Sequence, residues 1–397
     1  MKSSGRLGAE GDTPARLNKY PAFAYRIWHG MAASAWFPLL ARNRFAVSPS
    51  RVRRALAVSG CSVLNSGLNV AQKLIFAKRI AACKINDPPI FVIGHWRTGT
   101  TFLHELLALD ERFAAPSTLE CFTPGHFLVS GWFMRRLAFL LPAKRPMDNM
   151  RFGWERPQED EFALLNLGLR SPYEKIAFPN RGADCRAYLN MTEVSPAQVE
   201  AWKAGLSGFL QQLIFRRNKE KKQPGAAVRV VLKSPAHTAR IRILRQMFPA
   251  AKFIHAVRDP YAVFASTVRF WRAMYETQGF QKIKYDKLAA SGWSIENDVL
   301  ESMELLYRDF FTQMADIPPQ CICEVRYEDL VRAPVAEMSR IYGQLRLGPF
   351  EPAQQKIGAH LLELDEYKPN THRMSDEQES KVRQRWRWYF DRFNYPM

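Results

Sequence analysis

Apolar positions along the chain fall into two alternating kinds of segment. Short β-rich runs cover residues 88–93, 227–232, 252–257 and 321–325. Patterns with apolar residues three or four positions apart follow the first three runs, and another such pattern covers Ser195 to Arg217. Short strands alternating with helices predict an α/β fold, in which a central, mostly parallel sheet carries helices on both faces.

Residues 20–87 form a separate stretch in which helical patterns predominate. Leu64, Leu68, Ala71 and Ile75 have helical spacing, and basic residues precede them. We expect this N-terminal helical extension either to pack on the main domain or to lie on a membrane surface through residues 20–82. Its most apolar part, residues 27–41, is shorter than the roughly 20 residues of a spanning helix. The predicted organisation is a flexible N-terminus at 1–19, the extension at 20–87 and one α/β domain at 88–397.

Charge adds one restriction on partners. The 57 Lys and Arg residues outnumber the 38 Asp and Glu residues, which gives a formal net charge of +19. This excess indicates either a solvated basic surface or a field that attracts anions. No compact nucleic-acid-binding motif occurs, so we expect no nucleic-acid partner. The six cysteines lack paired or metal-ligand spacing, which predicts no metal site and a reducing, cytoplasmic location, with the inner membrane surface as the peripheral alternative.

The first apolar run ends in a glycine loop with the G-x-x-x-x-G spacing of a phosphate-binding loop. Thr100 stands where an ATP-binding loop has lysine, and the basic residue Arg97 lies inside the loop. A backbone cradle before a helix N-terminus still binds an anion, without the usual pair of lysine and magnesium. The predicted cradle is Gly94-His95-Trp96-Arg97-Thr98-Gly99-Thr100-Thr101.

The other apolar runs also end in distinctive polar residues. Lys233 and His237 follow the second run, Arg258 follows the third, and Tyr327 follows the fourth. Ligands of parallel sheets gather at the carboxyl ends of the strands, so we expect these side chains at one edge.

Together these clusters resemble the superfamily of sulfotransferases that use 3'-phosphoadenosine 5'-phosphosulfate (PAPS). Arg97 to Thr101 is similar to its 5'-phosphosulfate loop, Arg258 and Ser266 have the spacing of its 3'-phosphate site, and Tyr327 to Leu330 resembles a run near the adenine. The loop and residues 157–162 (Pro-Gln-Glu-Asp-Glu-Phe) look closest to a large, mostly bacterial branch. The resemblance implies a P-loop-like three-layer fold. It also implies in-line transfer of a sulfuryl group from PAPS, without a metal, to an acceptor hydroxyl or amine.

The resemblance implies a general base that is Glu in some branches and His in others. Glu120 lies 23 residues beyond Arg97 and is the first choice, although it would also suit a structural pair with an arginine. His237 is the second choice, because it follows Lys233 by four residues rather than two. Arg97 and Lys233 are predicted to contact the reacting group.

Three further expectations concern the surroundings of the site. Glu159, Asp160 and Glu161 either orient Arg97 or Lys233 or cap the helix that follows. Arg373 is a predicted cofactor contact. The loop and the Arg258 cluster are expected to form two separate cationic pockets, and an Arg258–Asp259 ion pair is the structural alternative for Arg258.

The acceptor is expected to be a small molecule, a lipid or a carbohydrate. An aromatic group either lines its site or belongs to the core: Phe122, Phe127, Trp132, Phe133 and Trp154. The segment from Phe113 to Phe178 that carries them is predicted to be irregular. Two other functions remain open from the residues alone, a P-loop nucleotide kinase or NTPase and a non-catalytic membrane-surface protein with a degenerate loop.

Overall fold

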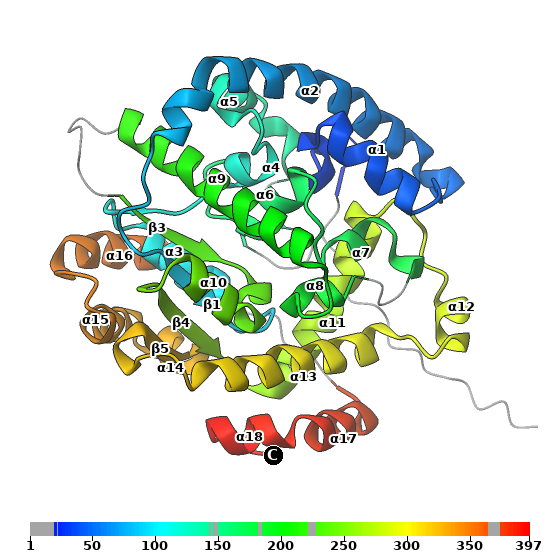
Figure 1. Ribbon diagram of the computed structural model, residues 1–397. Coiled ribbons are helices and arrows are strands. Elements are labelled where there is room, and N and C mark those ends of the chain that lie inside the picture. The colour runs from blue at the N-terminus through cyan, green and yellow to red at the C-terminus, as the bar shows by residue number, and fades with distance from the viewer. Residues whose placement is uncertain are drawn as a thin grey trace, which may run out of the picture.

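The centre of the molecule is a five-stranded sheet in the order β2-β3-β1-β4-β5, with all its pairings parallel (Figure 1). The computed structural model describes residues 20–21, 23–142, 144–145, 150–181, 185–220, 228–363 and 374–397. Four strands are the predicted ones, and the two-residue β2 is too short to show a pattern in the sequence. The strands are β1 Ile90–Ile93, β2 Phe113–Ala114, β3 Arg229–Lys233, β4 Lys252–Val257 and β5 Ile322–Arg326.

Alternate residues of β1 enter two different apolar cores. Ile90 and Val92 pack with α3, α15 and α16, whereas Phe91 and Ile93 pack with the helices of the opposite face. Successive side chains of a strand point to opposite faces, so a strand covered on both sides is apolar throughout. The predicted three-layer α/β architecture is therefore confirmed. The first face carries α3 Thr100–Ala108, α14 Tyr327–Arg332, α15 Pro334–Leu345 and α16 Glu351–Glu363.

The opposite face carries the longer helices and the C-terminal part of the chain. The helix predicted from Ser195 is α9, and the helices predicted after β3 and β4 are α10 and α11. Val382, Trp386 and Tyr389 of the C-terminal helical pattern are buried. The elements are α9 Pro196–Glu220, η5 Pro235–Ala239, α10 Ile241–Met247, α11 Pro260–Gln278, α12 Tyr285–Ala290, α13 Ile295–Met314, η6 Pro319–Cys321, α17 Asp376–Arg385 and α18 Arg387–Phe393.

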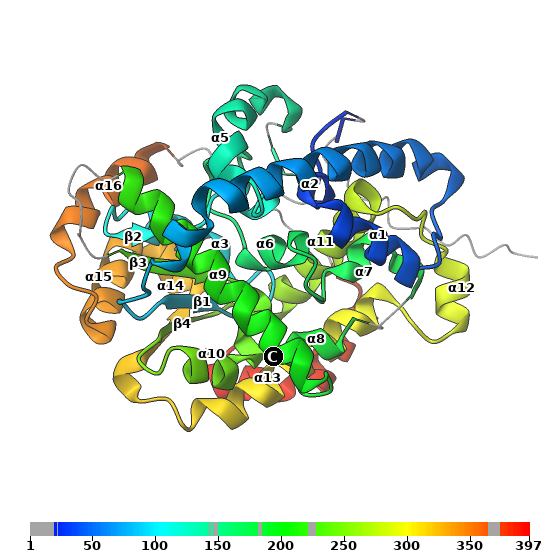
Figure 2. The same cartoon turned by 45° about the horizontal axis from the view of Figure 1, so that its top comes forward.

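The N-terminal extension packs on the main domain, but not through its apolar stripe. Its long helix α2 passes over α9 and α5 at the outside of the molecule (Figures 1 and 2). Leu64 and Ile75 of the apolar stripe are exposed, while Asn65 and Gln72 are buried. The extension therefore packs on the main domain, one of the two expected arrangements, and hydrogen-bonding side chains contribute to the covered side of α2. The elements are η1 Ile27–Gly30, α1 Ala33–Arg42, η2 Pro49–Arg51 and α2 Val52–Ala81.

The segment predicted to be irregular contains several short helices. Sequence patterns miss most of them because the α-helices other than Phe127–Arg136 have four to seven residues and show at most two turns of periodicity. Phe122, Phe127 and Trp154 are core residues, whereas Trp132 and Phe133 are exposed. The elements between β2 and α9 are α4 Thr118–Phe122, α5 Phe127–Arg136, η3 Ala138–Leu140, α6 Asp160–Asn166, α7 Glu174–Ala177, η4 Pro179–Arg181 and α8 Ala187–Asn190.

Candidate active site at the carboxyl edge of the sheet

The glycine loop joins β1 to α3 through three residues with positive φ. Gly94 has φ 139°, Arg97 has φ 70° and Gly99 has φ 93°. A Cβ atom on Gly99 would lie 2.3 Å from Cδ2 of Tyr327, and one on Gly94 would lie 2.5 Å from the Ala256 carbonyl oxygen. Glycine is therefore required at both positions for conformation and for space. Arg97 adopts a left-handed conformation that is uncommon for a residue with a side chain and is typical of functional sites.

Arg97, Arg258, Ser266 and Tyr327 come together around this loop. The Arg97 Nε donates to the Ser266 hydroxyl at 2.8 Å, and the Arg258 Nη1 donates to the Arg97 carbonyl oxygen at 3.2 Å. The Arg258 guanidinium carbon lies 4.2 Å from the centre of the Tyr327 ring. The two clusters are thus in hydrogen-bond contact, and their division into two anion-binding pockets stays a prediction. The strand order explains this contact. Because β1 and β4 are neighbouring parallel strands, the loop after β1 and Arg258 after β4 lie at the same edge of the sheet.

Asp259 has a local structural role beside Arg258. Its carboxylate accepts a hydrogen bond from the Ala262 N–H at 2.8 Å and caps the N-terminus of α11. The hydrogen bond places this carboxylate at the helix start, where it satisfies a free N–H group. The expected alternative, in which Asp259 neutralises Arg258, is therefore not the arrangement that we observe.

Side chains beneath the loop hold its shape. The Gly94 N–H donates to the Thr238 hydroxyl at 2.8 Å, and the Thr98 hydroxyl donates to the His95 carbonyl oxygen at 2.8 Å. The imidazole of His95 is fully buried, and burial lowers its pKa to about 3. His95 and Trp96 thus contribute buried side chains to the support of the loop.

Three consecutive acidic residues pair with three basic residues, which lie in β3, in η5 and directly before α10. The ion pairs are Glu159–Lys233 at 2.6 Å, Asp160–His237 at 2.7 Å and Glu161–Arg240 at 2.7 Å. No side-chain hydrogen bond from Glu159 caps α6, so the orienting interpretation holds for Lys233 and the capping interpretation does not. We call these three pairs the acid–base ladder. Arg240 was missed in the sequence because nothing local links it to Glu161.

A hydrogen-bonded chain joins the ladder to the glycine loop. The Trp96 Nε1 donates to the Tyr173 hydroxyl at 2.9 Å, and that hydroxyl donates to Glu159. Glu159 in turn accepts from Lys233. Burial lowers the pKa of Lys233, and the adjacent Glu159 charge opposes this shift. Lys233 is therefore linked to the loop through Glu159 and Tyr173. The sequence pattern did not reveal Tyr173 as a member of the site.

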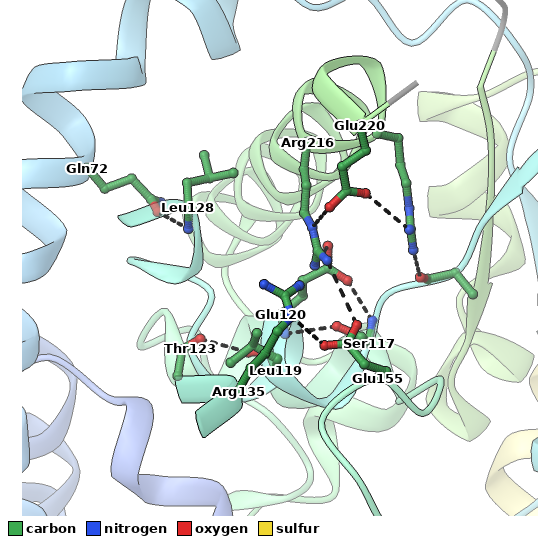
Figure 3. A network of polar contacts seen from close by, with 12 residues as sticks. Gln72, Ser117, Leu119, Glu120, Thr123, Leu128, Arg135, Glu155, Arg216 and Glu220 are labelled. Carbon is green, nitrogen blue, oxygen red and sulfur yellow. Dashed lines mark hydrogen bonds and ion pairs between the residues drawn. The ribbon is translucent and has the colours of Figure 1, made fainter. Parts of the chain in front are cut away.

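Glu120 is engaged in a structural network (Figure 3). Its Oε2 accepts the Ser117 N–H at 2.7 Å in a capping box, and its Oε1 lies 2.7 Å from Nη1 of Arg216. Arg216 also donates to Glu220 at 2.8 Å. The side chain of Glu120 is fully buried. The arginine pair foreseen as the alternative is present, so the catalytic role of Glu120 stays a prediction without a supporting contact.

His237 is held by one of its two ring nitrogens. Its Nε2 lies 2.7 Å from Oδ2 of Asp160, while Nδ1 is buried and has no hydrogen-bond partner among the described residues. The nearby Ser234 hydroxyl, directly after Lys233, is also buried and lacks a partner within the described part of the chain. A ring nitrogen fixed by a carboxylate leaves the other nitrogen as an acceptor.

The C-terminal helices reach the site through Tyr389. Its hydroxyl accepts the Arg258 N–H at 3.2 Å. Arg373, the predicted cofactor contact from this region, lies outside the described residues.

Comparisons with known proteins agree with this geometry. A profile described as "Sulfotransferase family" matches residues 88–352. Proteins of Mycobacterium bovis and Mycobacterium tuberculosis, each named "Omega-hydroxy-beta-dihydromenaquinone-9 sulfotransferase Stf3", are 41% identical over 381 residues, which cover 96% of this chain and 94% of theirs.

Two solved structures share the fold at low sequence identity. Sulfotransferase STF9 of Mycobacterium avium is 16% identical with a TM-score of 0.65, and the match covers 93% of this chain and 98% of that one. Sulfotransferase STF1 of Mycobacterium tuberculosis is 18% identical with a TM-score of 0.62, over 92% and 93% of the two chains.

Proposed function

Since this chain belongs to the sulfotransferase family and is a sulfotransferase, we propose that PAPS is its donor and that a hydroxylated membrane lipid is its acceptor. The contact between Arg97, Ser266 and Arg258 carries the donor assignment. Family membership also removes the nucleotide kinase, the NTPase and the non-catalytic protein as alternatives.

The residues at the carboxyl edge suit the anionic groups of PAPS. The glycine loop ends at the N-terminus of α3, where free N–H groups favour a phosphate or sulfate. Arg258 has a planar guanidinium that suits two-point contact with a terminal phosphate, and Ser266 adds a hydroxyl. Tyr327 supplies an aromatic face beside Arg258. The Ser234 hydroxyl directly after β3 has no hydrogen-bond partner among the described residues and is a further donor that is available to a ligand.

When bound, PAPS supplies a sulfuryl group that passes to the acceptor oxygen as the bond between sulfur and the phosphate oxygen breaks. Negative charge develops on the oxygen that leaves with the phosphate, and fixed cations stabilise it. We assign this stabilisation to Arg97 and Lys233. The Tyr173–Glu159 chain keeps the Lys233 ammonium in a fixed position, so little reorganisation is needed during the reaction.

We propose that Nδ1 of His237 is the general base that accepts the proton of the acceptor hydroxyl. Asp160 accepts a hydrogen bond from the Nε2–H group, so the proton stays on Nε2 and the Nδ1 lone pair is available to act as a base. Glu120 is the less suitable group, since its oxygens already contact Ser117 and Arg216. Transfer of a proton to a buried carboxylate would remove the charge that pairs with Arg216.

The acceptor proposal comes from the relatives that are 41% identical over almost the whole chain. The name of these relatives specifies an ω-hydroxylated dihydromenaquinone. We propose a hydroxylated isoprenoid quinone, or a lipid alcohol of the same class, as the acceptor of this chain.

The test measures sulfation of the proposed acceptor by the natural chain and by one variant of each candidate base, His237 and Glu120. Purified protein is incubated with PAPS and an ω-hydroxylated menaquinone in mixed micelles, and the sulfated product is measured by mass spectrometry. We expect product with the natural chain and a loss of at least about 100-fold in kcat with His237→Gln, which retains a donor for Asp160. Glu120→Gln should keep its turnover per folded molecule.

The desulfated product, 3'-phosphoadenosine 5'-phosphate (PAP), provides the control for the donor site. Both variants should retain the rise in melting temperature that PAP causes by binding the folded state. A Glu120→Gln protein with a normal PAP response and no turnover would transfer the base role to Glu120. Sulfation of a sugar but not of the quinone alcohol would refute the proposed acceptor.

A further inference from the structure

The outward side of α2 carries a long apolar stripe. Leu56, Val63, Val70 and Leu74 recur at steps of seven, seven and four residues, which places them on one side of a helix. All four are exposed, and Leu74 is 82% exposed. Leu64 and Ile75 widen the stripe and are exposed as well. We call these six residues the outer stripe.

The inward side of α2 contributes Ala55 and Val58 to the core and is otherwise polar, with Ser62, Asn65 and Gln72 buried. The Asn65 amide donates to the carbonyl oxygens of His29 at 2.7 Å and Met31 at 2.9 Å. The Ser59 hydroxyl accepts from Trp36 Nε1 at 2.9 Å, and Gln72 accepts from the Leu128 N–H at 2.8 Å. These contacts fix which side of the helix faces the protein, so the outer stripe cannot rotate inward without breaking them.

The neighbouring helix α5 continues the apolar exposure. It contacts α2 and lies beside it in both views (Figures 1 and 2). Trp132 and Phe133 in its second half are 64% and 49% exposed. Exposed patches of this kind mark interaction sites on soluble proteins, and tryptophan favours the interface between water and lipid.

Charge identifies the partner of this surface. Residues 20–86 contain ten Lys and Arg residues and no Asp or Glu. Arg53, Lys73, Lys78 and Arg79 of α2 are exposed. A second copy of the chain would bring two such cationic surfaces together, whereas an anionic surface complements both the charge and the apolar stripe.

We propose that the outer stripe of α2 docks in the interfacial region of an anionic lipid bilayer. The helix lies along the membrane surface, with its apolar side among the acyl chains and its basic residues at the headgroups. No described helix meets the length and hydropathy needed to cross a bilayer, which fits a helix that lies flat on the surface. Docking does not depend on the donor site, although it would bring the protein to the lipid acceptor proposed above.

The test uses co-sedimentation of the full chain with vesicles of phosphatidylcholine alone or with one quarter phosphatidylglycerol. We expect stronger binding to the anionic vesicles, and a drop of at least about fivefold in the partition coefficient with Leu74→Asp. Leu362→Asp is the matched control, since Leu362 is 77% exposed, belongs to a different helix, α16, and undergoes the same chemical change. It should bind within about twofold of the natural chain.

Three results would overturn the proposal: no binding of the natural chain to anionic vesicles, unchanged binding of Leu74→Asp, or an equal loss with Leu362→Asp. A dimer in light scattering that Leu74→Asp abolishes, without vesicle binding, would assign the outer stripe to a second copy instead. The PAP-induced rise in melting temperature is measured on all three proteins. If PAP does not raise the melting temperature of the natural chain, the result counts against the proposed donor site. If PAP does raise it but the chain does not bind vesicles, the result counts against docking alone.

Discussion

Arg258 and Ser266 show how far residue types at a fixed spacing can predict a site. Eight residues separate them in the sequence, and the start of α11 places the hydroxyl near the arginine at the strand end. Both contact Arg97, from a different strand end, through hydrogen bonds that the structure supplies. A local motif therefore predicts the members of this cluster, while the sheet order determines their mutual contacts.

Removal of the Ser266 hydroxyl should weaken nucleotide binding modestly. We expect Ser266→Ala to raise the dissociation constant of PAP about five- to tenfold, which corresponds to the net contribution of roughly 1 kcal/mol from one hydrogen bond. Isothermal titration calorimetry measures this constant directly. Arg272→Ala is the control on the same helix, because Arg272 is paired with Glu296 at the surface and should leave PAP binding unchanged. Equal binding by Ser266→Ala and the natural chain would exclude Ser266 from the phosphate site.

The partners of buried charges could not be predicted from the sequence. Glu120 meets Arg216 on α9, and Glu161 meets Arg240 after β3. Each pair joins segments about 80 to 100 residues apart, and no local pattern encodes such a contact. The sequence therefore identified Glu120 as a notable carboxylate but gave no information on what it touches.

At the scale of elements, α2 departs from the rule that links an apolar stripe to the core. Its existence and type were predictable because the helical period extends over many residues. Its orientation was not, since the hydrogen bonds of Asn65 and Ser59 to other segments decide which side faces inward. Periodicity identifies a helix with two unlike sides and leaves open which side is covered.

Two adjacent residues of α2 provide a direct test of this orientation. We expect Asn65→Ala to lower the free energy of unfolding by about 2 kcal/mol, because two buried carbonyl groups lose their donors. Leu64→Asn, one position away on the exposed side, should change it by no more than about 0.5 kcal/mol. Urea denaturation followed by circular dichroism measures both values. The opposite ranking would mean that α2 packs through its leucines.

At the scale of the whole molecule, buried neutral histidines connect stability to pH. Burial lowers the pKa of His95 and His104 to about 3 and that of His29 and His126 to about 4. These groups are spread over the N-terminal extension, the glycine loop, α3 and the start of α5. In the unfolded chain a histidine has a pKa near 6.5, so acid favours the unfolded state at each of these positions.

We therefore expect stability to fall as the pH decreases from 6.5 towards 4. Below pH 6.5 the unfolded chain binds protons that the folded chain does not, and each histidine contributes a slope of up to about 1.4 kcal/mol per pH unit. Above pH 7 both states are neutral at these positions and this contribution vanishes. Unfolding free energies between pH 4.5 and 8 measure the slope, and His104→Gln should reduce it. A flat profile across this range would show that these histidines are accessible to protons in the folded state.

The acid–base ladder limits how the chain can change in length. Glu159, Asp160 and Glu161 are consecutive, yet each pairs with a different basic residue, in β3, in η5 or directly before α10. Deletion of one residue just before them would bring Asp160 to Lys233 and Glu161 to His237 and would leave Arg240 facing Phe162, so all three matched contacts would be lost in a single event. Substitution of one side chain alters one ion pair, whereas a shift in register alters all three. We therefore expect this junction to tolerate replacement of side chains better than any insertion or deletion.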